Sequence, residues 1–337
     1  KDRGYKDFIY DIKIELENGK GLGTTKAGQL KQKFKQERLK INGKTKMFKD
    51  AAVNVFERNK NKGENITKYA LLMETLSEIS DEELRFDLQT NIQDGYAKPE
   101  DLNTVLPRAG ENEDVEGPDD EDGDGGRQLG VPTATRRWGS GIIRYTVVLE
   151  NDLSGFFMWV YRVLPAMAEL EAITNLEFKA VKGVWTYGDA KADGTVYLRV
   201  QSNGCSASVG APPLGGITRI NIGPNCGHGS ILHELLHTAG MSHQQVAQYR
   251  DNYVTVNLQN VVSGKAHNFE KRFNHGLEFV YDYGSIMHYG EYGFSSNGQK
   301  TIDCRGNSCG QRGGLSMWDV WEIVYYYYGY YFVNQNL

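Results

Sequence analysis

Residues 233–243 read HELLHTAGMSH, and this stretch decides how the rest of the chain is interpreted. Three of the seven histidines of the chain fall within it. His233 and His237 are four residues apart, so on a helix their rings lie on one face, one turn from each other. Gly240 predicts the end of that helix, because glycine adopts the left-handed conformation without steric cost. The turn that follows brings His243 back to the same point.

The residue types in this pattern are those of a metal site that leaves room for a reactive water. Three neutral imidazole nitrogens at about 2 Å suit Zn²⁺ and leave one coordination position open. Glu234 stands beside His233, where it reaches that water rather than the metal. A lone histidine is more often a core or surface ring, but here five positions of HExxHxxGxxH are matched. The pattern predicts a zinc site of the protease type, with Glu234 as its acid–base group.

A second motif follows the third histidine, where residues 285–290 read SIMHYG. A methionine-bearing turn after the histidine motif is typical of metzincins. With both motifs, the chain resembles the astacin family. The resemblance implies that Met287 lies beneath the metal. It also implies that Tyr289 is a further ligand, which swings away to hydrogen-bond the transition state.

The resemblance covers roughly residues 137–329 and includes the segments RWGSGIIRYTV, NGCSASVG and RDNYVTVNLQNV. It implies an α+β fold, a zincin catalytic domain with an active-site helix and a mixed sheet. The local patterns agree with this class: GIIRYTVVL and GTVYLRV are β-rich, and helical spacing runs over about 156–173, 229–239 and 318–328. An extended substrate is expected to pair with an edge strand near residues 196–201.

The four cysteines fit disulfides in an oxidising compartment, although their number alone allows three pairings or buried free thiols. The family resemblance implies that Cys205 pairs with Cys226, and that Cys304 and Cys309 close a small local loop. The family's second long-range disulfide has no counterpart here. Asn175 stands at its first position, and the tail YYYYGYYFVNQNL at residues 325–337 holds no cysteine. Packing of the tyrosine-rich tail is expected to take its place.

Charge divides the chain into three segments. Residues 111–124 read ENEDVEGPDDEDGD, with nine acidic side chains and no basic one, which is typical of a solvated linker. We therefore predict a largely helical N-terminal pro-domain over residues 1–109. An acidic linker and activation segment follows over 110–127, and an astacin-like metalloprotease domain over 128–337.

Family members are commonly made as zymogens in which an aspartate of the pro-segment occupies the zinc. VEGPD at residues 115–119 is the nearest match to the family's FxGD segment, so Asp119 is the candidate blocking ligand, with Asp120 next. The alternative is that both are ordinary linker acids. Arg127, just past the acidic tract, predicts a cleavage site for an activating trypsin-like protease. Gln244 stands where the family has a glutamate that receives the new N-terminal amine, and an amide accepts that hydrogen bond without charge.

The net charge and the length of the apolar runs argue against two classes of protein. A net charge of −5 gives no case for nucleic acid, which calls for a basic face. No apolar run is long enough for a membrane span. The start at Lys1 fits the removal of a signal peptide, or an arbitrary boundary.

The sequence thus predicts a secreted zinc endopeptidase that acts on proteins or peptides and is made as a latent precursor. The alternative is a non-catalytic zinc-containing binding module with an N-terminal interaction domain. The open coordination position and the intact Glu234 argue against that alternative, since a structural zinc ordinarily has four closed protein ligands.

Overall fold

The computed structural model describes residues 43–59, 68–82, 85, 137–138, 141–148, 153–174, 176–184, 196–200, 204–212, 218–272 and 281–328. They fall into two compact units, one within Trp138–Ala239 and one that combines Gly43–Arg137 with Gly240–Leu337. Within these ranges no helix combines the length and the apolar character needed to cross a membrane. Asp119, Asp120, Arg127, Asn175 and the tail after Tyr328 lie outside the described residues.

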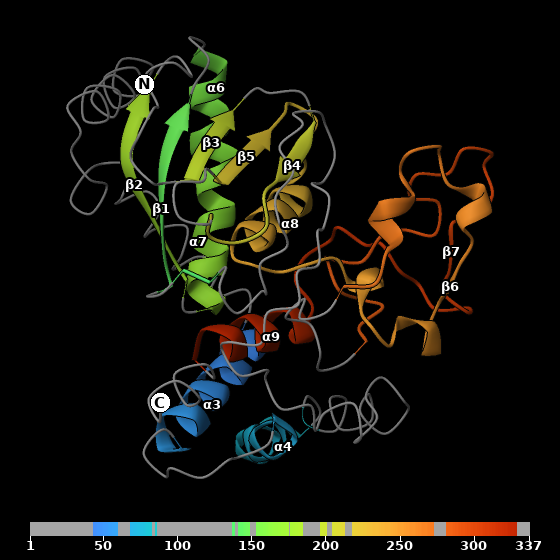
Figure 1. Cartoon of the computed structure of the whole chain (residues 1–337). Helices are drawn as coiled ribbons and strands as arrows, with labels where there is room; N and C mark the ends of the chain where they lie inside the picture. The colour runs from blue at the N-terminus through green and yellow to red at the C-terminus, as the bar shows by residue number, and fades with distance from the viewer. Residues whose placement is uncertain are drawn as a thin grey trace. The chain divides into compact units, whose positions relative to one another are not determined.

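The unit within Trp138–Ala239 is built on a five-stranded mixed sheet in the order β2-β1-β3-β5-β4 (Figure 1). The strands are β1 (Ile142–Val148), β2 (Glu177–Val184), β3 (Val196–Val200), β4 (Cys205–Ala207) and β5 (Thr218–Ile222). All neighbours run parallel except β4, which is antiparallel to β5. The inner strands β1 and β3 are rich in valine, isoleucine and tyrosine and almost entirely buried, as expected for strands covered on both faces.

The position of β3 corrects one expectation. Substrate pairing was expected near residues 196–201, but β3 pairs with β1 on one side and β5 on the other. It therefore has no unpaired edge. The end strands of the described sheet are β2 and β4, and of these β4 contacts α8, the helix of the first two motif histidines. β4 is therefore the end strand near the histidines that could accept an added one. The error arose because strand order in a sheet with crossovers does not follow chain order.

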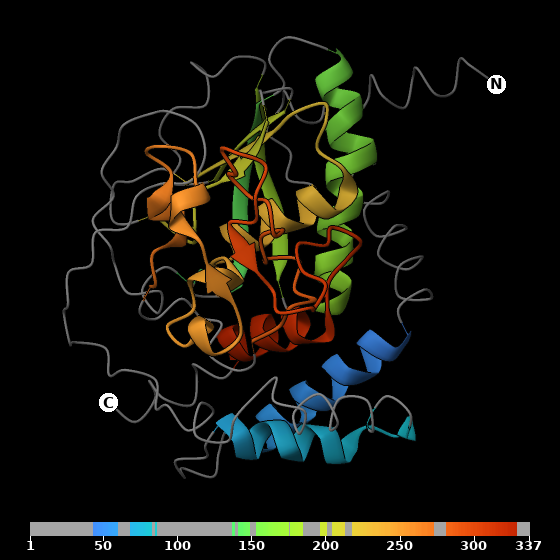
Figure 2. The ribbon, with the colours of Figure 1, turned by 90° about the vertical axis from the view of Figure 1, so that its right-hand side faces the viewer.

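A long helix runs beside this sheet in both ribbon views (Figures 1 and 2). It consists of α6 (Leu153–Met158), the π-helical turn η4 (Trp159–Val163) and α7 (Leu164–Ile173). Pro165 lies in the first turn of α7. Proline has no N–H to donate, and the preceding turn is wound wider, with the Leu164 N–H bonded to the Trp159 carbonyl. Nearly every residue of α7 is buried, so this helix is part of the core.

The last helix of this unit is α8 (His228–Thr238), which carries the first two motif histidines. It contacts α7, β4 and β5. Glu169 of α7 and His228 of α8 are joined side chain to side chain, with 2.8 Å between Oε2 and Nε2. This bond fixes the start of α8 against a buried helix.

The other unit contains few regular elements between Gly240 and Asp303. They are η6 (Gln244–Val246), η7 (Arg250–Asn252), β6 (Thr255–Val256), η8 (Leu258–Asn260), η9 (Ala266–Phe269) and β7 (Ile302–Asp303), with β6 and β7 antiparallel. A cluster of buried aromatic rings replaces a sheet core. Tyr253 and Tyr281 stack with ring centroids 4.8 Å apart, and Phe269 meets Tyr289 edge-on at 5.9 Å. The Cys304–Cys309 disulfide lies against this cluster.

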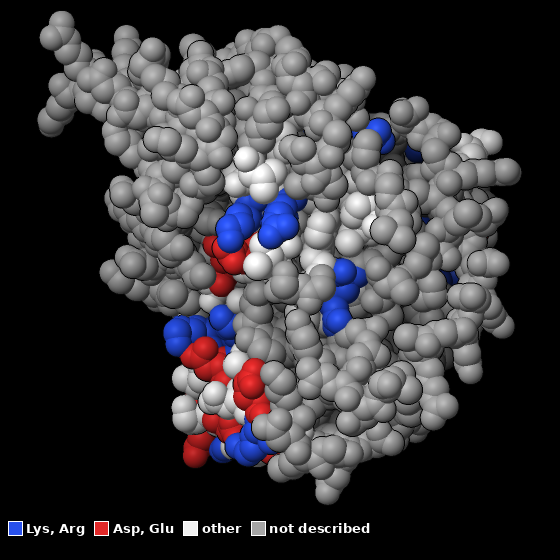
Figure 3. Space-filling view, turned by 60° about the vertical axis from the view of Figure 1, so that its left-hand side comes forward, with Lys and Arg blue, Asp and Glu red and all other residues white. Residues whose placement is uncertain are grey.

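Within the described residues, the same unit also contains the helices α3 (Gly43–Asn59), α4 (Lys68–Glu78) and α9 (Met317–Tyr328). α3 contacts both α4 and α9, and both ribbon views show α3 and α9 side by side (Figures 1 and 2). Acidic and basic side chains lie next to one another at the lower left of Figure 3. α3 and α4 are joined by ion pairs such as that between Arg58 and Glu74. These side chains form a solvated face.

The observed elements confirm the α+β class with a mixed sheet. Strands form at 142–148 and 196–200, and helices at 153–173, 228–238 and 317–328, within a few residues of the predicted ranges. In the N-terminal part, α3 and α4 are helical. The boundaries 1–109, 110–127 and 128–337 stay predictions.

Candidate active site

The local sequence explains why α8 forms and where it stops. Its apolar residues Ile231, Leu232, Leu235 and Leu236 are all fully buried. At its end, Thr238 Oγ1 donates to the Glu234 carbonyl (3.0 Å), and Trp138 Nε1 donates to the Thr238 carbonyl (2.7 Å). The Thr238 carbonyl, one of those that a helix end leaves without a partner in the helix, is thereby satisfied.

Gly240 then turns the chain, as its position in the motif predicts. Its φ is +106°, a conformation that side chains rarely adopt, and a Cβ there would meet a Tyr326 ring carbon at 3.1 Å. Both the backbone and the space therefore require glycine. The turn leads directly to His243, the residue before η6.

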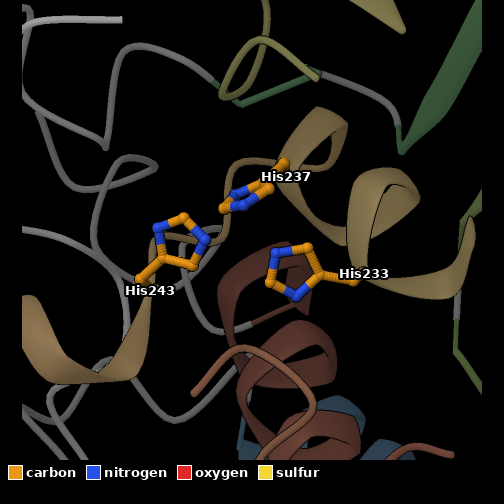
Figure 4. Close-up of side chains that lie close together, drawn as sticks. All are labelled: His233, His237 and His243. Carbon is orange, nitrogen blue, oxygen red and sulfur yellow. The ribbon is translucent and has the colours of Figure 1, made fainter. Parts of the chain in front are cut away.

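The three motif histidines lie together. One ligand atom from each of His233, His237 and His243 falls within 4.8 Å of the other two. All three side chains are buried, and Figure 4 shows the rings facing a common point. The His233 and His237 rings meet edge to face, with centroids 4.6 Å apart, as one turn of helix places them.

These residues fit a zinc ion. Three imidazoles within one coordination radius are a donor set that Zn²⁺ accepts while keeping a position open for water or substrate. Glu234 follows the first ligand and is buried, with 6% of its surface exposed. A carboxylate in a dry site requires a charged or hydrogen-bonding partner, and a metal ion held by the three histidines would supply a positive charge beside it.

A second group of possible ligands, His288 with Cys304 and Cys309, does not fit a metal. The two cysteines are joined in a disulfide. Both ring nitrogens of His288 are hydrogen-bonded, Nε2 to the Tyr281 hydroxyl (2.7 Å) and Nδ1 to the Tyr289 carbonyl (2.6 Å). Burial lowers the pKa of His288 from 6.5 to about 4, so the ring is neutral and serves as a structural bridge.

The methionine turn is held by a carboxylate from α9. Asp319 accepts hydrogen bonds from Ser285 Oγ (2.6 Å) and from the Ile286 N–H (3.0 Å), while the Met287 N–H donates to Ser285 Oγ (3.0 Å). Met287 is fully buried. The turn is further tied to the third ligand, because the Gln244 N–H donates to the Met287 carbonyl (3.0 Å).

The same carboxylate caps its own helix. The Ser316 N–H donates to Asp319 (2.9 Å), and the Asp319 N–H donates back to Ser316 Oγ (2.9 Å). This reciprocal pair is a capping box. Neither residue was predicted from the sequence, although the pattern Ser316-x-x-Asp319 was a visible signal for the start of α9. Nothing in that pattern points to residue 285, so the hydrogen bond from Ser285 to Asp319 could not be predicted from the sequence.

A second aspartate, Asp282, lies beside Asp319 and its hydrogen-bond partners. Asp282 accepts from Ser316 Oγ (2.5 Å) and from the Gly284 N–H (2.8 Å). Burial, and then the charge of Asp319, raise the pKa of Asp282 from 3.8 to about 7. Burial also raises the pKa of Asp319. Two buried carboxyls this close resist carrying two charges.

Tyr289 packs on His243, the third motif histidine. Its ring centroid lies 4.3 Å from that of His243, and its N–H donates to Gln245 Oε1 (3.2 Å). Gln244 itself is buried, with 1% of its surface exposed. The structure also forms both disulfides that the resemblance implies, Cys205–Cys226 and Cys304–Cys309.

The edge strand β4 leads past the histidine helix. The Gly210 N–H, just after β4, donates to the His237 carbonyl (2.8 Å), and the Gly210 carbonyl accepts from Thr218 Oγ1 (3.0 Å). The Cys205–Cys226 disulfide joins the start of β4 to the segment before α8. Edge strand and ligand helix are therefore fixed to each other at both ends.

A histidine triad in HExxHxxGxxH, a glutamate within it and a clamped methionine turn define the metzincin class of zinc peptidases. Comparison with known sequences gives the family. The sequence model of the astacin peptidase family matches residues 130–328, more than half of the chain, so the chain belongs to the astacin family of zinc metalloendopeptidases.

Individual proteins with similar sequences include members named as proteases. Protein SpAN of Strongylocentrotus purpuratus is 39% identical over 196 residues, covering 55% of this chain and 30% of that protein. High choriolytic enzyme 2 of Oryzias latipes is 39% identical over 125 residues, covering 36% of this chain and 45% of that protein. The chain thus spans less than half of these two relatives. A solved structure of high choriolytic enzyme 1, a hatching enzyme zinc-protease from Oryzias latipes, aligns with a TM-score of 0.46 and 30% identity, covering 57% of this chain and 92% of that one.

Proposed function

We propose that this chain is a secreted zinc endopeptidase that hydrolyses peptide bonds in proteins and is made as a latent precursor. The observation that carries the proposal is the convergence of His233, His237 and His243, with ligand atoms within 4.8 Å and Glu234 buried beside the first. A bound zinc would polarise the scissile carbonyl and lower the pKa of its water towards about 7.

The protein's own groups have separate roles in the proposed reaction. Glu234 accepts the proton of the attacking water and delivers it to the leaving amine. Tyr289 donates its phenolic hydrogen bond to the oxyanion that develops on the carbonyl. Met287 lies under the ligand set as a packed, uncharged support.

The substrate main chain would pair with β4. Among the described strands β4 is hydrogen-bonded only to β5, and an extended peptide adds to such an edge by main-chain bonds. The Gly210 bond to His237 supports this placement, since it sets the edge strand beside a ligand. The scissile bond would then pass close to the metal without any rearrangement of the sheet.

Secretion and latency rest on the sequence and on the disulfides. Both disulfides fit an oxidising compartment. Residues 1–127 would be the pro-domain, Asp119 the carboxylate that blocks the metal, and Arg127 the bond cut by a trypsin-like protease. Asp119→Ala should give activity before any cleavage, whereas Asp120→Ala should not. Equal latency in both variants would remove Asp119 from this role.

The decisive experiment is Glu234→Gln, with Glu177→Gln on the exposed face of β2 as the matched control. After cleavage of the acidic segment, elemental analysis should find about one zinc per chain in wild type and both variants. Hydrolysis of a denatured protein substrate should fall by about 10²–10⁴ in Glu234→Gln alone, the range of general acid–base catalysis. Zinc without hydrolysis in all three proteins would instead support the non-catalytic binding module.

A further inference from the structure

The helix α3 carries a continuous apolar stripe. Phe48, Ala52, Val55 and Phe56 follow the spacing of one helix face, and each has at most 1% of its surface exposed. On the opposite face Asn54 is exposed. α3 therefore buries one side completely, although it precedes the family-like part of the chain by about 70 residues.

The partner of that stripe is α9. The rings of Phe48 and Phe56 lie 5.8 Å and 5.4 Å from Trp321, centroid to centroid, and Phe56 also meets Tyr325 edge-on at 6.0 Å. Trp321 is fully buried. Buried aromatic side chains bury about 150–250 Å² each in a folded protein, so these rings make the α3–α9 contact strongly apolar.

The helix α4 is bound to α3 by ion pairs and a hydrogen bond. Arg58 near the end of α3 forms ion pairs with Glu74 and Glu78 of α4, and Asn59 Nδ2 donates to Glu74 Oε2 (2.9 Å). Leu72 and Leu76 of α4 are fully buried. α3 and α4 therefore act as one pair, which we call the α3–α4 pair.

None of these contacts depends on the peptide bonds of the acidic segment. The four cysteines pair among themselves and all follow residue 204, so no disulfide joins residues 1–127 to the rest. In the part of the chain that the structure describes, the α3–α4 pair is held on α9 by packed side chains and not by a disulfide. Cutting the chain between residues 110 and 127 would leave that packing as it is.

We propose that the α3–α4 pair stays bound to α9 after the acidic segment is cut, so that cleavage yields a two-chain protein and does not release the N-terminal part. The proposal rests on the proposed cleavage of that segment. The occupant of the α9 surface is the chain's own residues 43–79, and its removal would expose Trp321 to water. The N-terminal part would then be a permanent partner of the catalytic part as well as its inhibitor.

The test uses the full chain with a recognition sequence for a site-specific protease in place of residues 120–125. Glu234→Gln is included so that no peptidase activity acts on the fragments. After complete cleavage, native size-exclusion chromatography with mass spectrometry should find both fragments in one peak near the uncut volume. Separate elution of the N-terminal fragment would overturn the proposal. Because hydrolysis is not measured, this outcome is independent of the proposed function.

Two substitutions in α3 locate the contact. In Phe56→Ala the fraction of released N-terminal fragment at a fixed micromolar concentration should rise about tenfold or more, as for an aromatic anchor of an interface. Asn54→Ala, two residues away and exposed, should behave as wild type. If Phe56→Ala does not fold, Phe56→Leu takes its place, with an expected rise of about threefold. Equal release from the Phe56 and Asn54 variants would refute α9 as the binding surface.

Discussion

The carboxylate of Asp319 should be the most sensitive side chain outside the metal ligands. Asp319→Ala removes the acceptor of three donors, Ser285 Oγ, the Ile286 N–H and the Ser316 N–H. Each buried donor left without an acceptor costs about 1–3 kcal/mol, so the three together cost ~3–9 kcal/mol. Relief of the repulsion from Asp282 returns part of this. We expect a net loss of about 3–5 kcal/mol in the free energy of unfolding.

Thermal unfolding followed by circular dichroism measures this loss. For a domain of about 200 residues, 1 kcal/mol shifts Tm by about 2–4 °C, so Tm should fall by about 6–20 °C. The matched control is Asp50→Ala, whose carboxylate forms only an exposed pair with Lys46 on α3 and should change Tm by less than about 1–2 °C. Asp319→Asn, which keeps one acceptor and loses the charge, should lie between them.

The Asp319→Ala variant also tests whether the hydrogen bonds of Asp319 to the methionine turn affect hydrolysis. If Asp319 positions the methionine turn, protein hydrolysis by the surviving folded fraction should fall while zinc content is kept. A wild-type Tm for Asp319→Ala would refute the reasoning, because it would mean that the three donors find other acceptors at no cost. A lowered Tm with unchanged kcat per folded molecule would confine the role of Asp319 to stability.

Three further outcomes are expected. Asp282 has a folded-state pKa of about 7 against 3.8 in the unfolded chain. The folded protein therefore keeps a proton that the unfolded chain releases, and the stability from this group is full below about pH 4 and lost as pH rises through 7. Asp282→Asn cannot ionise, so its Tm difference between pH 5 and pH 8 should be smaller than that of wild type; an unchanged difference would contradict the assignment. Gly310→Ala should cost about 2–4 kcal/mol, because φ is +80° and a Cβ would lie 2.2 Å from backbone, whereas Gly298→Ala, at φ +76° in open space, should cost ~1 kcal/mol; equal denaturant midpoints for the two would count against it. Replacing the Cys205–Cys226 pair by alanines, which opens a loop with a sequence separation of 21, should lower stability by about 3 kcal/mol in urea unfolding, and a loss below ~1 kcal/mol would show that β4 is held by its hydrogen bonds instead.

The clustering of the three motif histidines could be predicted from the sequence because it is local. Eleven consecutive residues contain all three ligands, and the helix period and one glycine at φ +106° place them. The same holds for α8, whereas the Cys304–Cys309 pairing was implied by the family resemblance and not by local spacing. Such features need no knowledge of how distant segments meet.

The features that were missed all depend on distant segments. The capping box at 316–319 could be recognised in the sequence. The other partner of Asp319, Ser285, lies 34 residues earlier in the chain and could not. The edge strand was misassigned because β5 lies between β3 and β4 in the sheet. The sequence of one strand does not show which strands will be its neighbours. The apolar stripe of α3 could be recognised as one face of a helix, but its partner α9 lies more than 250 residues further on.

The helix α9 is where these distant contacts meet, and this bears on the missing family disulfide. A second disulfide closing about 150 residues would contribute ~5 kcal/mol in the chain-entropy model. In this chain α9 is fixed at its first turn by Asp319 and along its length by the rings of α3. Three aromatic pairs at about 0.5–1.5 kcal/mol each, beyond the area they bury, supply a stabilisation of the same order. That replacement works only while α3 remains bound, because a packing contact, unlike a disulfide, is lost when its partner dissociates. Retention of the α3–α4 pair would therefore be a condition for a stable catalytic part, and not a by-product of incomplete processing.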